Sequence, residues 1–153
     1  MLTQIQATWP DGRQPSDQHH DWNWPEICRG TPEAFCLVHQ PGTVAAIWCG
    51  KHRPIRLAEK TFYRLDRFEV CPSYRGTTIG LLTFSIIAGR ALELAADGLV
   101  LASLPAAVDF YRKLGGEQRK FQEWNVDDEL IPFVFDKQKL LELHEDVDEL
   151  IVR

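Results

Sequence analysis

The stretch that decides the fold reads FYRLDRFEVCPSYRGTTIG and covers residues 62–80. Residues 62–70 are strand-like, and Pro72 ends the strand because proline has no N–H group for the ladder. A glycine-bearing turn and a long apolar helix follow. The first N–H groups of a helix lack intrahelical partners and carry partial positive charge, so a strand, a glycine turn and a helix in this order bind phosphate groups.

The charge around this stretch favours the same kind of ligand. The net charge of the chain is −5, yet residues 51–75 are basic. Three acidic residues there, Glu59, Asp66 and Glu69, face seven basic ones: Lys51, Arg53, Arg56, Lys60, Arg64, Arg67 and Arg75. Such a local excess attracts an anion. The acidic residues gather instead in 142–149, which we interpret as a solvated helix face.

The turn resembles motif A of the GCN5-related N-acetyltransferase (GNAT) superfamily, R/Q-x-x-G-x-G/A preceded by V-x-P. Val70, Pro72, Arg75 and Gly80 fit this pattern, whereas Thr78 stands at the middle glycine. A backbone N–H survives that change, so the diphosphate site is retained but weakened or re-angled. A βα turn of another α/β protein is the alternative interpretation.

A second stretch, LPAAVDFYRKLG at 104–115, resembles motif B of the same superfamily, A-x-x-F/L-Y-x-K-x-G-F. Leu104 replaces the asparagine often found at its start, which removes one hydrogen bond to a cofactor. Gly116 replaces the usual aromatic residue and is expected to change only the packing under the next strand.

Together the motifs imply an α+β (α/β/α) GNAT fold. In that fold a mixed, mostly antiparallel central sheet is splayed between its two middle strands and flanked by helices. The splay is associated with a β-bulge, expected here near Glu69 to Cys71. The length of 153 residues fits one acyltransferase domain, 1–153, in which a helix at 137–152 covers the sheet or pairs with a second subunit.

The pattern predicts the remaining elements in chain order. A weak first strand at 2–7 is followed by short helical turns at 16–22 and 25–29. Strands at 35–39 and 43–49 form a hairpin, and 50–60 is a loop or ragged strand edge. A helix at 77–96 has a polar face of Thr83, Arg90, Glu93 and Asp97, and the pair Asp97-Gly98 caps it.

Beyond that helix the pattern continues to alternate strands and helices. A strand at 99–103 runs parallel to 62–70 because the helix makes a right-handed crossover. Pro105 starts a second helix, whose core stripe is Ala107, Phe110 and Leu114, and Gly115 stops it. Closing strands are expected at 117–124 and 130–136.

For catalysis, the family pattern implies an oxyanion donor and an acid for the departing thiolate. We assign the donor to the backbone N–H of Val70 and the acid to Tyr111. Tyr111 lies about 100° around the helix from Phe110 and so leaves the core stripe toward the gap between the central strands. The alternative role of Tyr111 is a packed tyrosine bonded to backbone.

The base that accepts the amine proton has several candidates. Asp66 and Glu69 both lie on the central strand, but they differ by an odd number of positions and point to opposite faces. Asp66 is preferred, with Glu69, a water chain or no protein base as alternatives. The structural interpretation of either carboxylate is a salt bridge to Arg64 or Arg67.

The resemblance implies acetyl-CoA as acyl donor and an amine-bearing acceptor, either a small molecule or a protein. Trp22 and Trp24 are candidates for the acceptor pocket, although anchoring to the core is the alternative. The residues expected to bind the cofactor are Phe68, Val70, Cys71, Arg75, Gly76, Thr77, Thr78, Ile79, Gly80, Ser103 and Tyr111.

Composition narrows the class of protein. The net charge argues against a general nucleic-acid binder, and the cysteines at 28, 36, 49 and 71 have no CxxC spacing, so we expect core cysteines and no metal. No leader or membrane span is evident, which predicts a cytoplasmic monomer or homodimer. Besides an N-acetyltransferase, two interpretations stay open: a catalytically silent CoA-binding or protein-interaction module, and an enzyme for longer acyl-CoA donors.

Overall fold

The structure, a computed structural model, describes residues 33–40, 43–75 and 78–151. The predictions for 2–7, 16–22 and 25–29, together with Trp22, Trp24, Gly76 and Thr77, lie outside these residues. The chain divides into two compact units. Of the described residues, unit 1 contains 33–51, 67–75 and 78–83 without 41–42, and unit 2 contains 52–66 and 84–151. The expectation of a single domain over 1–153 stays a prediction.

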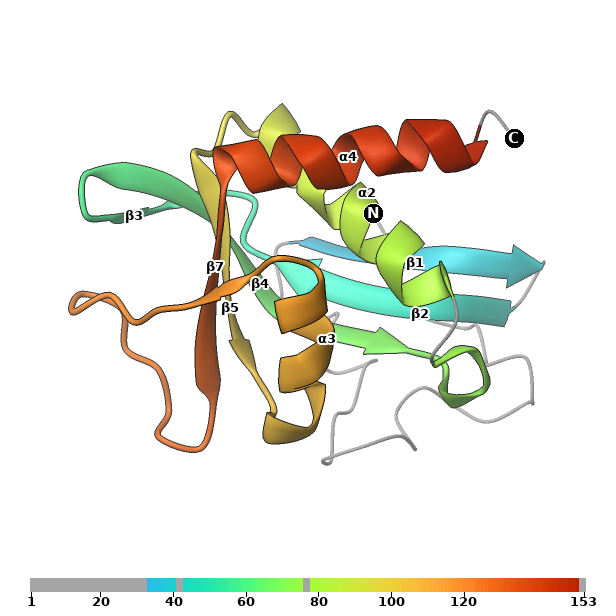
Figure 1. Ribbon diagram of the computed structural model, residues 1–153, viewed down its shortest axis with the longest axis horizontal. Coiled ribbons are helices and arrows are strands. Elements are labelled where there is room, and N and C mark those ends of the chain that lie inside the picture. The colour runs from blue at the N-terminus through green and yellow to red at the C-terminus, as the bar shows by residue number, and fades with distance from the viewer. Residues whose placement is uncertain (1–32, 41–42, 76–77, 152–153) are drawn as a thin grey trace. The chain divides into compact units, whose positions relative to one another are not determined.

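The strands form a mixed sheet in the order β1-β2-β4-β5-β7-β6, and β3 pairs with β4 off this path (Figure 1). The strand β4 (Lys60–Val70) begins in unit 2 and ends in unit 1, whereas the helix α2 (Thr78–Glu93) begins in unit 1 and ends in unit 2. Mostly antiparallel strands with one parallel central pair confirm the predicted α+β sheet.

Unit 1 contains the predicted hairpin, slightly longer than expected. The strands β1 (Glu33–Gln40) and β2 (Thr43–Gly50) pair antiparallel, and the stacked rings of Phe35 and Trp48 lie 5.5 Å apart. Aromatic cross-strand pairs of this kind stabilise a hairpin register. The register of this pair shifts between Leu37 and Val38, where β2 has an extra residue, and between Val38 and Gln40, where β1 has one. The bulge expected near Glu69 to Cys71 stays a prediction.

Unit 2 contains a short strand that the sequence analysis treated as a loop or ragged edge. The strand β3 (Ile55–Leu57) pairs antiparallel with the start of β4, and Ala58 and Glu59 turn the chain with φ values of 48° and 66°. A two-residue turn with two positive φ values matches the twist of a hairpin. Glu123 accepts a hydrogen bond from the N–H of Ala58 at 3.3 Å, which ties this turn to residues 119–130.

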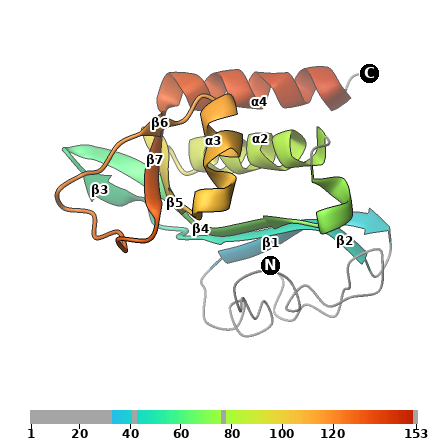
Figure 2. The ribbon, with the colours of Figure 1, turned by 60° about the horizontal axis from the view of Figure 1, so that its bottom comes forward.

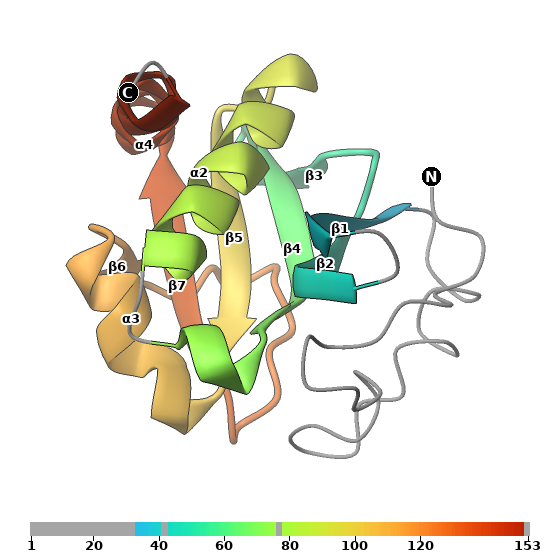
Figure 3. The same ribbon diagram turned by 90° about the vertical axis from the view of Figure 1, so that its right-hand side faces the viewer.

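The strands of unit 2 present two different faces. β5 (Gly98–Ser103) is parallel to β4 as predicted, and β7 (Ile131–Asp136) is antiparallel to β5. One face, here called the helix face, carries Leu99, Leu101, Phe133 and Phe135. The helices α3 (Val108–Lys113) and α4 (Lys137–Ile151), with the part of α2 that belongs to unit 2, cover this side of the strands (Figures 2 and 3). The opposite face, the loop face, carries Phe62, Val100 and Val134.

The loop face shows where the prediction of a closing strand at 117–124 was wrong. The strand β6 covers only Glu117–Gln118. Residues beyond it leave the sheet and pack Phe121, Trp124 and Val126 against Phe62 and Val100. The rings of Phe62 and Phe121 lie 5.3 Å apart. Burial of these apolar side chains therefore favours a loop across the sheet over a longer ladder.

The helix α2 ends earlier than predicted, at Glu93, and Gly98 lies in β5 instead of capping the helix. The N–H of Ala96 donates to the carbonyl of Ala91 at 3.1 Å, and Ala95 has a φ of 56°. This is a Schellman ending with alanine at the left-handed position. The predicted polar face is also partly wrong, because Thr83 is fully buried and donates its hydroxyl to the Ile79 carbonyl at 2.7 Å.

The second helix agrees with the prediction at both ends. A 3-10 turn η3 (Pro105–Ala107) leads into α3, and Gly115 ends it with a φ of 93°. A Cβ atom on Gly116 would lie 2.7 Å from Cζ of Phe135, so the ring of Phe135 fills the space where motif B usually has an aromatic side chain. The expected core stripe was wrong in one respect, since Tyr111 is the buried residue of α3.

The C-terminal helix forms as predicted. Asp136 caps α4 by accepting the N–H of Lys139 at 2.9 Å, and Leu140 and Leu143 are buried. A Cβ atom on Gly89 of α2 would lie 2.9 Å from Nδ1 of His144, so α4 packs closely against α2. None of the helices in the described ranges combines the length and apolar character needed to cross a membrane.

Candidate functional site

The candidate residues of unit 2 lie where the two parallel strands stop pairing. The register between β4 and β5 runs from Phe62 opposite Gly98 to Leu65 opposite Leu101. β5 continues beyond this point and stays paired with β7 as far as Ser103 opposite Ile131. The end of the ladder agrees with the predicted splay between the middle strands, and Asp66 lies one residue and Ser103 two residues beyond it.

Asp66, the preferred base, forms a close ion pair. Nε of Arg64 donates to Oδ1 of Asp66 at 2.6 Å, and the Asp66 side chain is 13% exposed. The two side chains are two positions apart and share a face of β4, the loop face that also carries Phe62. Arg64 therefore orients the carboxylate.

Tyr111, the predicted acid, lies on the helix face and is surrounded by aromatic rings. Its ring centroid lies 5.2 Å from that of Phe110, 5.8 Å from Phe133 and 5.9 Å from Phe84. Burial raises the pKa of the phenol above its usual value near 10, so the hydroxyl stays protonated at neutral pH. Among the described residues, none bonds to this hydroxyl, so the alternative role of a tyrosine bonded to backbone is not observed.

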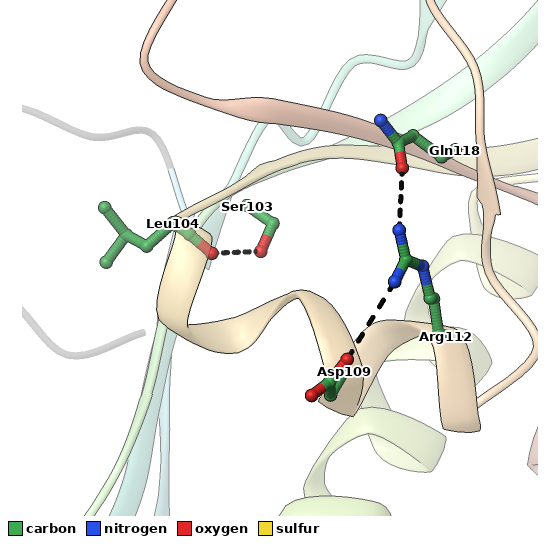
Figure 4. A network of polar contacts seen from close by, with 5 residues as sticks. All are labelled: Ser103, Leu104, Asp109, Arg112 and Gln118. Atoms are coloured by element: carbon green, nitrogen blue, oxygen red, sulfur yellow. Dashed lines mark hydrogen bonds and ion pairs between the residues drawn. The ribbon is translucent and has the colours of Figure 1, made fainter.

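Ser103 and Leu104 begin the segment that resembles motif B. The Ser103 hydroxyl is buried and donates to the carbonyl of Leu104 at 2.7 Å (Figure 4). Arg112 of α3 reaches Asp109 at 3.9 Å and donates to Gln118 at 3.2 Å, which ties the helix to β6. The Ser103 hydroxyl oxygen can still accept a hydrogen bond. It is a polar side-chain group next to Leu104, whose side chain has none.

Unit 1 contains the other candidate residues, and three of them come together. Nε of Arg75 donates to the carbonyl of Val70 at 3.2 Å, and its Nη2 lies 3.9 Å from Oε1 of Glu69. The Glu69 side chain is 3% exposed, whereas that of Arg75 is 39% exposed. The guanidinium therefore has one edge against the strand end and another edge open to water.

The backbone of Cys71 is already engaged. Its N–H donates to the Ala45 carbonyl at 2.8 Å, and its carbonyl accepts the N–H of Tyr74 at 2.9 Å within the 3-10 turn η2 (Pro72–Tyr74). This leaves the N–H of Cys71 unavailable for the cofactor contact expected of it. The half-buried side chains of Phe68 and Val70 lie just before this turn.

The start of α2 fits a diphosphate group. Its first turn contains no acidic residue, Thr78 is exposed, and Ile79 and Gly80 follow it into the helix. Unsatisfied N–H groups and the helix dipole favour an anion there, and Arg75 adds a charge that faces solvent. The described residues of the predicted phosphate site, Arg75 and 78–80, are thus compatible with the phosphorylated part of CoA.

One of these relationships was not predicted from the sequence. A salt bridge of either carboxylate to Arg64 or Arg67 was expected, and it is confirmed for Asp66 with Arg64. The contact of Glu69 with Arg75 depends on the chain turning back through η2, and spacing along a strand carries no signal for it. Cys49 and Cys71 are buried, as predicted, and form no disulfide bond. Within the described ranges no cluster of His, Cys, Asp or Glu would hold a metal ion.

No family model and no curated protein matches this sequence, but solved structures do. A protein described as a bacterial toxin matches with a TM-score of 0.65 and 20% identity over 93% of this chain and 92% of that chain. A GNAT-family acetyltransferase from Listeria monocytogenes matches at 0.57 and 14% over 82% and 78%. AtaTR bound with AcCoA matches at 0.55 and 19% over 72% and 70%. The chain therefore has the fold of the GNAT acetyltransferases.

Proposed function

We propose that the protein is an acyl-CoA-dependent N-acyltransferase that transfers an acetyl group to an amine. The observation that carries this proposal is the end of the β4–β5 ladder at Leu65 and Leu101, with Asp66 one residue and Ser103 two residues beyond it. Two parallel strands that part in this way expose backbone groups to a ligand instead of to each other. The GNAT fold and the AcCoA described for AtaTR support the same donor.

The two candidate catalytic residues of unit 2 suit different steps of the acetyl transfer. Asp66 lies on the loop face and is the proposed base for the attacking amine, while Tyr111 lies on the helix face and is the proposed acid. Bound acetyl-CoA supplies an activated thioester carbonyl. The amine nitrogen bonds to that carbonyl and passes its proton to Asp66 or to solvent through water, and Tyr111 protonates the departing thiolate.

The backbone of unit 1 is proposed to hold the donor. The N–H of Val70 is the proposed oxyanion donor, and Arg75 with residues 78–80 is the proposed binding site for the diphosphate. Gly76 and Thr77 belong to the same proposed site. Phe68 of unit 1 is a further proposed cofactor contact. Ser103 of unit 2 is another, with a hydroxyl oxygen where the Leu104 side chain has none.

The acceptor is a primary amine of a small molecule or a protein. Trp22 and Trp24 remain proposed pocket residues. A toxin of the acetyltransferase kind is a second and more specific candidate, because the similarity to a bacterial toxin extends over 93% of this chain. Induced expression that stops bacterial growth, with growth restored by Tyr111→Phe, would support this candidate, and unimpaired growth would exclude it.

The experiment that tests the enzyme is thiol release from acetyl-CoA in the presence of polyamines, aminoglycosides, lysine peptides and N-terminal peptides. We expect release with at least one amine, and we expect Asp66→Asn to lower it by about 10²-fold at neutral pH. Arg64→Gln should lower it less, because the carboxylate remains. CoA binding without release from any amine would favour the silent binding module instead.

A longer acyl donor is tested with the same assay. Faster release from butyryl-CoA or hexanoyl-CoA than from acetyl-CoA would keep the enzyme and change the donor. Equal or slower release would support acetyl-CoA.

A further inference from the structure

We propose that Glu69 is a positioning residue for Arg75, and that it thereby sets the affinity of the protein for the phosphorylated part of its acyl donor. This inference rests on the proposed function. It assigns to Glu69 a role other than that of the alternative base. Glu69, Arg75 and the start of α2 all belong to unit 1.

The burial of Glu69 is the first observation. Its side chain is 3% exposed at the end of β4, and a carboxylate is costly to bury unless positive charge and hydrogen bonds compensate it. Nη2 of Arg75 lies 3.9 Å from Oε1 of Glu69. A buried anion at this distance holds a guanidinium on one side of its range of motion.

The second observation is the other edge of the guanidinium. Nε of Arg75 donates to the carbonyl of Val70 at 3.2 Å, so one hydrogen bond and one longer ion pair from adjacent residues of β4 restrain the group. Arginine presents its N–H donors in a rigid fork, so a restrained guanidinium presents them in a defined direction. With 39% of the side chain exposed, the guanidinium can be reached by a phosphate group from solvent.

The position of Arg75 identifies the ligand chemistry. It lies three residues before Thr78, the first residue of α2, and the first turn of α2 has no acidic side chain. A guanidinium and a helix N-terminus together favour a diphosphate over a monovalent carboxylate. A flexible arginine would lose more side-chain entropy on binding than one that is already fixed, so preorganisation raises affinity.

The sign of the effect separates positioning from simple charge. Replacing Glu69 by glutamine removes a negative charge near a bound anion, and charge alone would then make CoA bind more tightly. Loss of positioning makes it bind more weakly. We expect Glu69→Gln to weaken CoA binding about tenfold, with most of the affinity restored in Glu69→Asp.

The test is a calorimetric titration of the full-length protein with CoA and with pantetheine, which lacks the diphosphate. Weaker binding of Glu69→Gln to CoA with unchanged binding to pantetheine is the expected result. Equal or tighter binding to CoA would overturn the inference while leaving the proposed function intact. Equal loss for both ligands would also overturn it, because a merely structural role predicts that pattern.

Arg75→Lys provides the second variant, since Arg75 is exposed and its replacement does not disturb the core. Lysine keeps the charge but loses the fork, so CoA should again bind about tenfold more weakly, and adding Glu69→Gln should have no further effect. Unchanged CoA affinity in Arg75→Lys would overturn the inference even if Glu69→Gln failed to fold. A wild-type protein that binds neither CoA nor pyrophosphate would overturn the proposed function and this inference together.

Discussion

Asp97 and Thr61 are joined by three hydrogen bonds, here called the Asp97–Thr61 clamp. Oδ2 of Asp97 accepts from the N–H of Thr61 at 2.9 Å and from the hydroxyl at 3.2 Å, and the N–H of Asp97 donates to the Thr61 carbonyl at 2.7 Å. This clamp joins the end of the α2–β5 turn to the start of β4, within unit 2. The two strands whose parting marks the candidate site are thus fixed at their other end.

The clamp makes stability depend on pH. The hydrogen bond from the Thr61 backbone, helped by nearby Lys137 and Lys60, lowers the pKa of Asp97 below its usual value of 3.8. A group with a lowered folded-state pKa stabilises the protein above its unfolded-state pKa and loses that effect as pH falls through the folded-state value. Asp97→Asn should therefore lower the melting temperature at pH 7, and by less near pH 3.

Asp128→Asn is the matched control, because Asp128 is exposed in the segment 119–130. It should leave the melting temperature within error at both pH values. A decrease for Asp97→Asn that is the same at pH 7 and at pH 3 would contradict a role for the ionised carboxylate.

Replacing Ala95 by glycine should make the folded protein more stable. Its φ of 56° is in the left-handed region, which costs an alanine free energy that a glycine avoids. The residue is exposed, so Ala95→Gly removes no packing. We expect the free energy of unfolding in urea to rise by about 1 kcal/mol. Ala106→Gly, at an exposed position without positive φ, should lower it, and a loss of stability in Ala95→Gly would contradict the Schellman ending.

Tyr111→Phe separates the packing of the ring from the chemistry of the hydroxyl. The rings of Phe84 and Phe133 contact the part of the side chain that phenylalanine keeps, and no hydrogen bond is lost among the described residues. The melting temperature should change little, while kcat for amine-dependent thiol release should fall about 10²–10⁴-fold. Tyr63→Phe, at another buried tyrosine of unit 2, should keep kcat. Full activity in Tyr111→Phe would remove it as the acid.

The helices and strands predicted from the sequence were confirmed where the sequence pattern and the packing agree. The hairpin, the central strand and the tail helix follow periods of two or of three and four residues. β5 is a short apolar run, and its parallel direction follows from the helical crossover. The predicted strand at 117–124 failed because Phe121 and Trp124 gain more by covering the loop face than by extending a ladder. The predicted cap at Gly98 failed because Ala95 adopts the left-handed conformation instead.

The candidate site was predictable in part for the same reason. Strand periodicity separated the faces of Asp66 and Glu69, and the ion pair of Asp66 with Arg64 follows from their spacing. It did not reveal which cation approaches Glu69, since Arg75 reaches it only after the chain passes through η2. Likewise the aromatic surroundings of Tyr111 come from α2 and β7, elements distant in sequence from α3.

The measurement that tests the central claim most directly is a calorimetric titration of the wild-type protein and three variants at Thr78 with acetyl-CoA. Thr78 is exposed in the first turn of α2, where a glutamate suits the helix dipole but repels a diphosphate. We predict binding to the wild type, equal binding to Thr78→Gln, tighter binding to Thr78→Gly, and no measurable binding to a folded Thr78→Glu. Absence of binding to the wild type and to Thr78→Gly, or undiminished binding to Thr78→Glu, would contradict an acyl-CoA site at this helix.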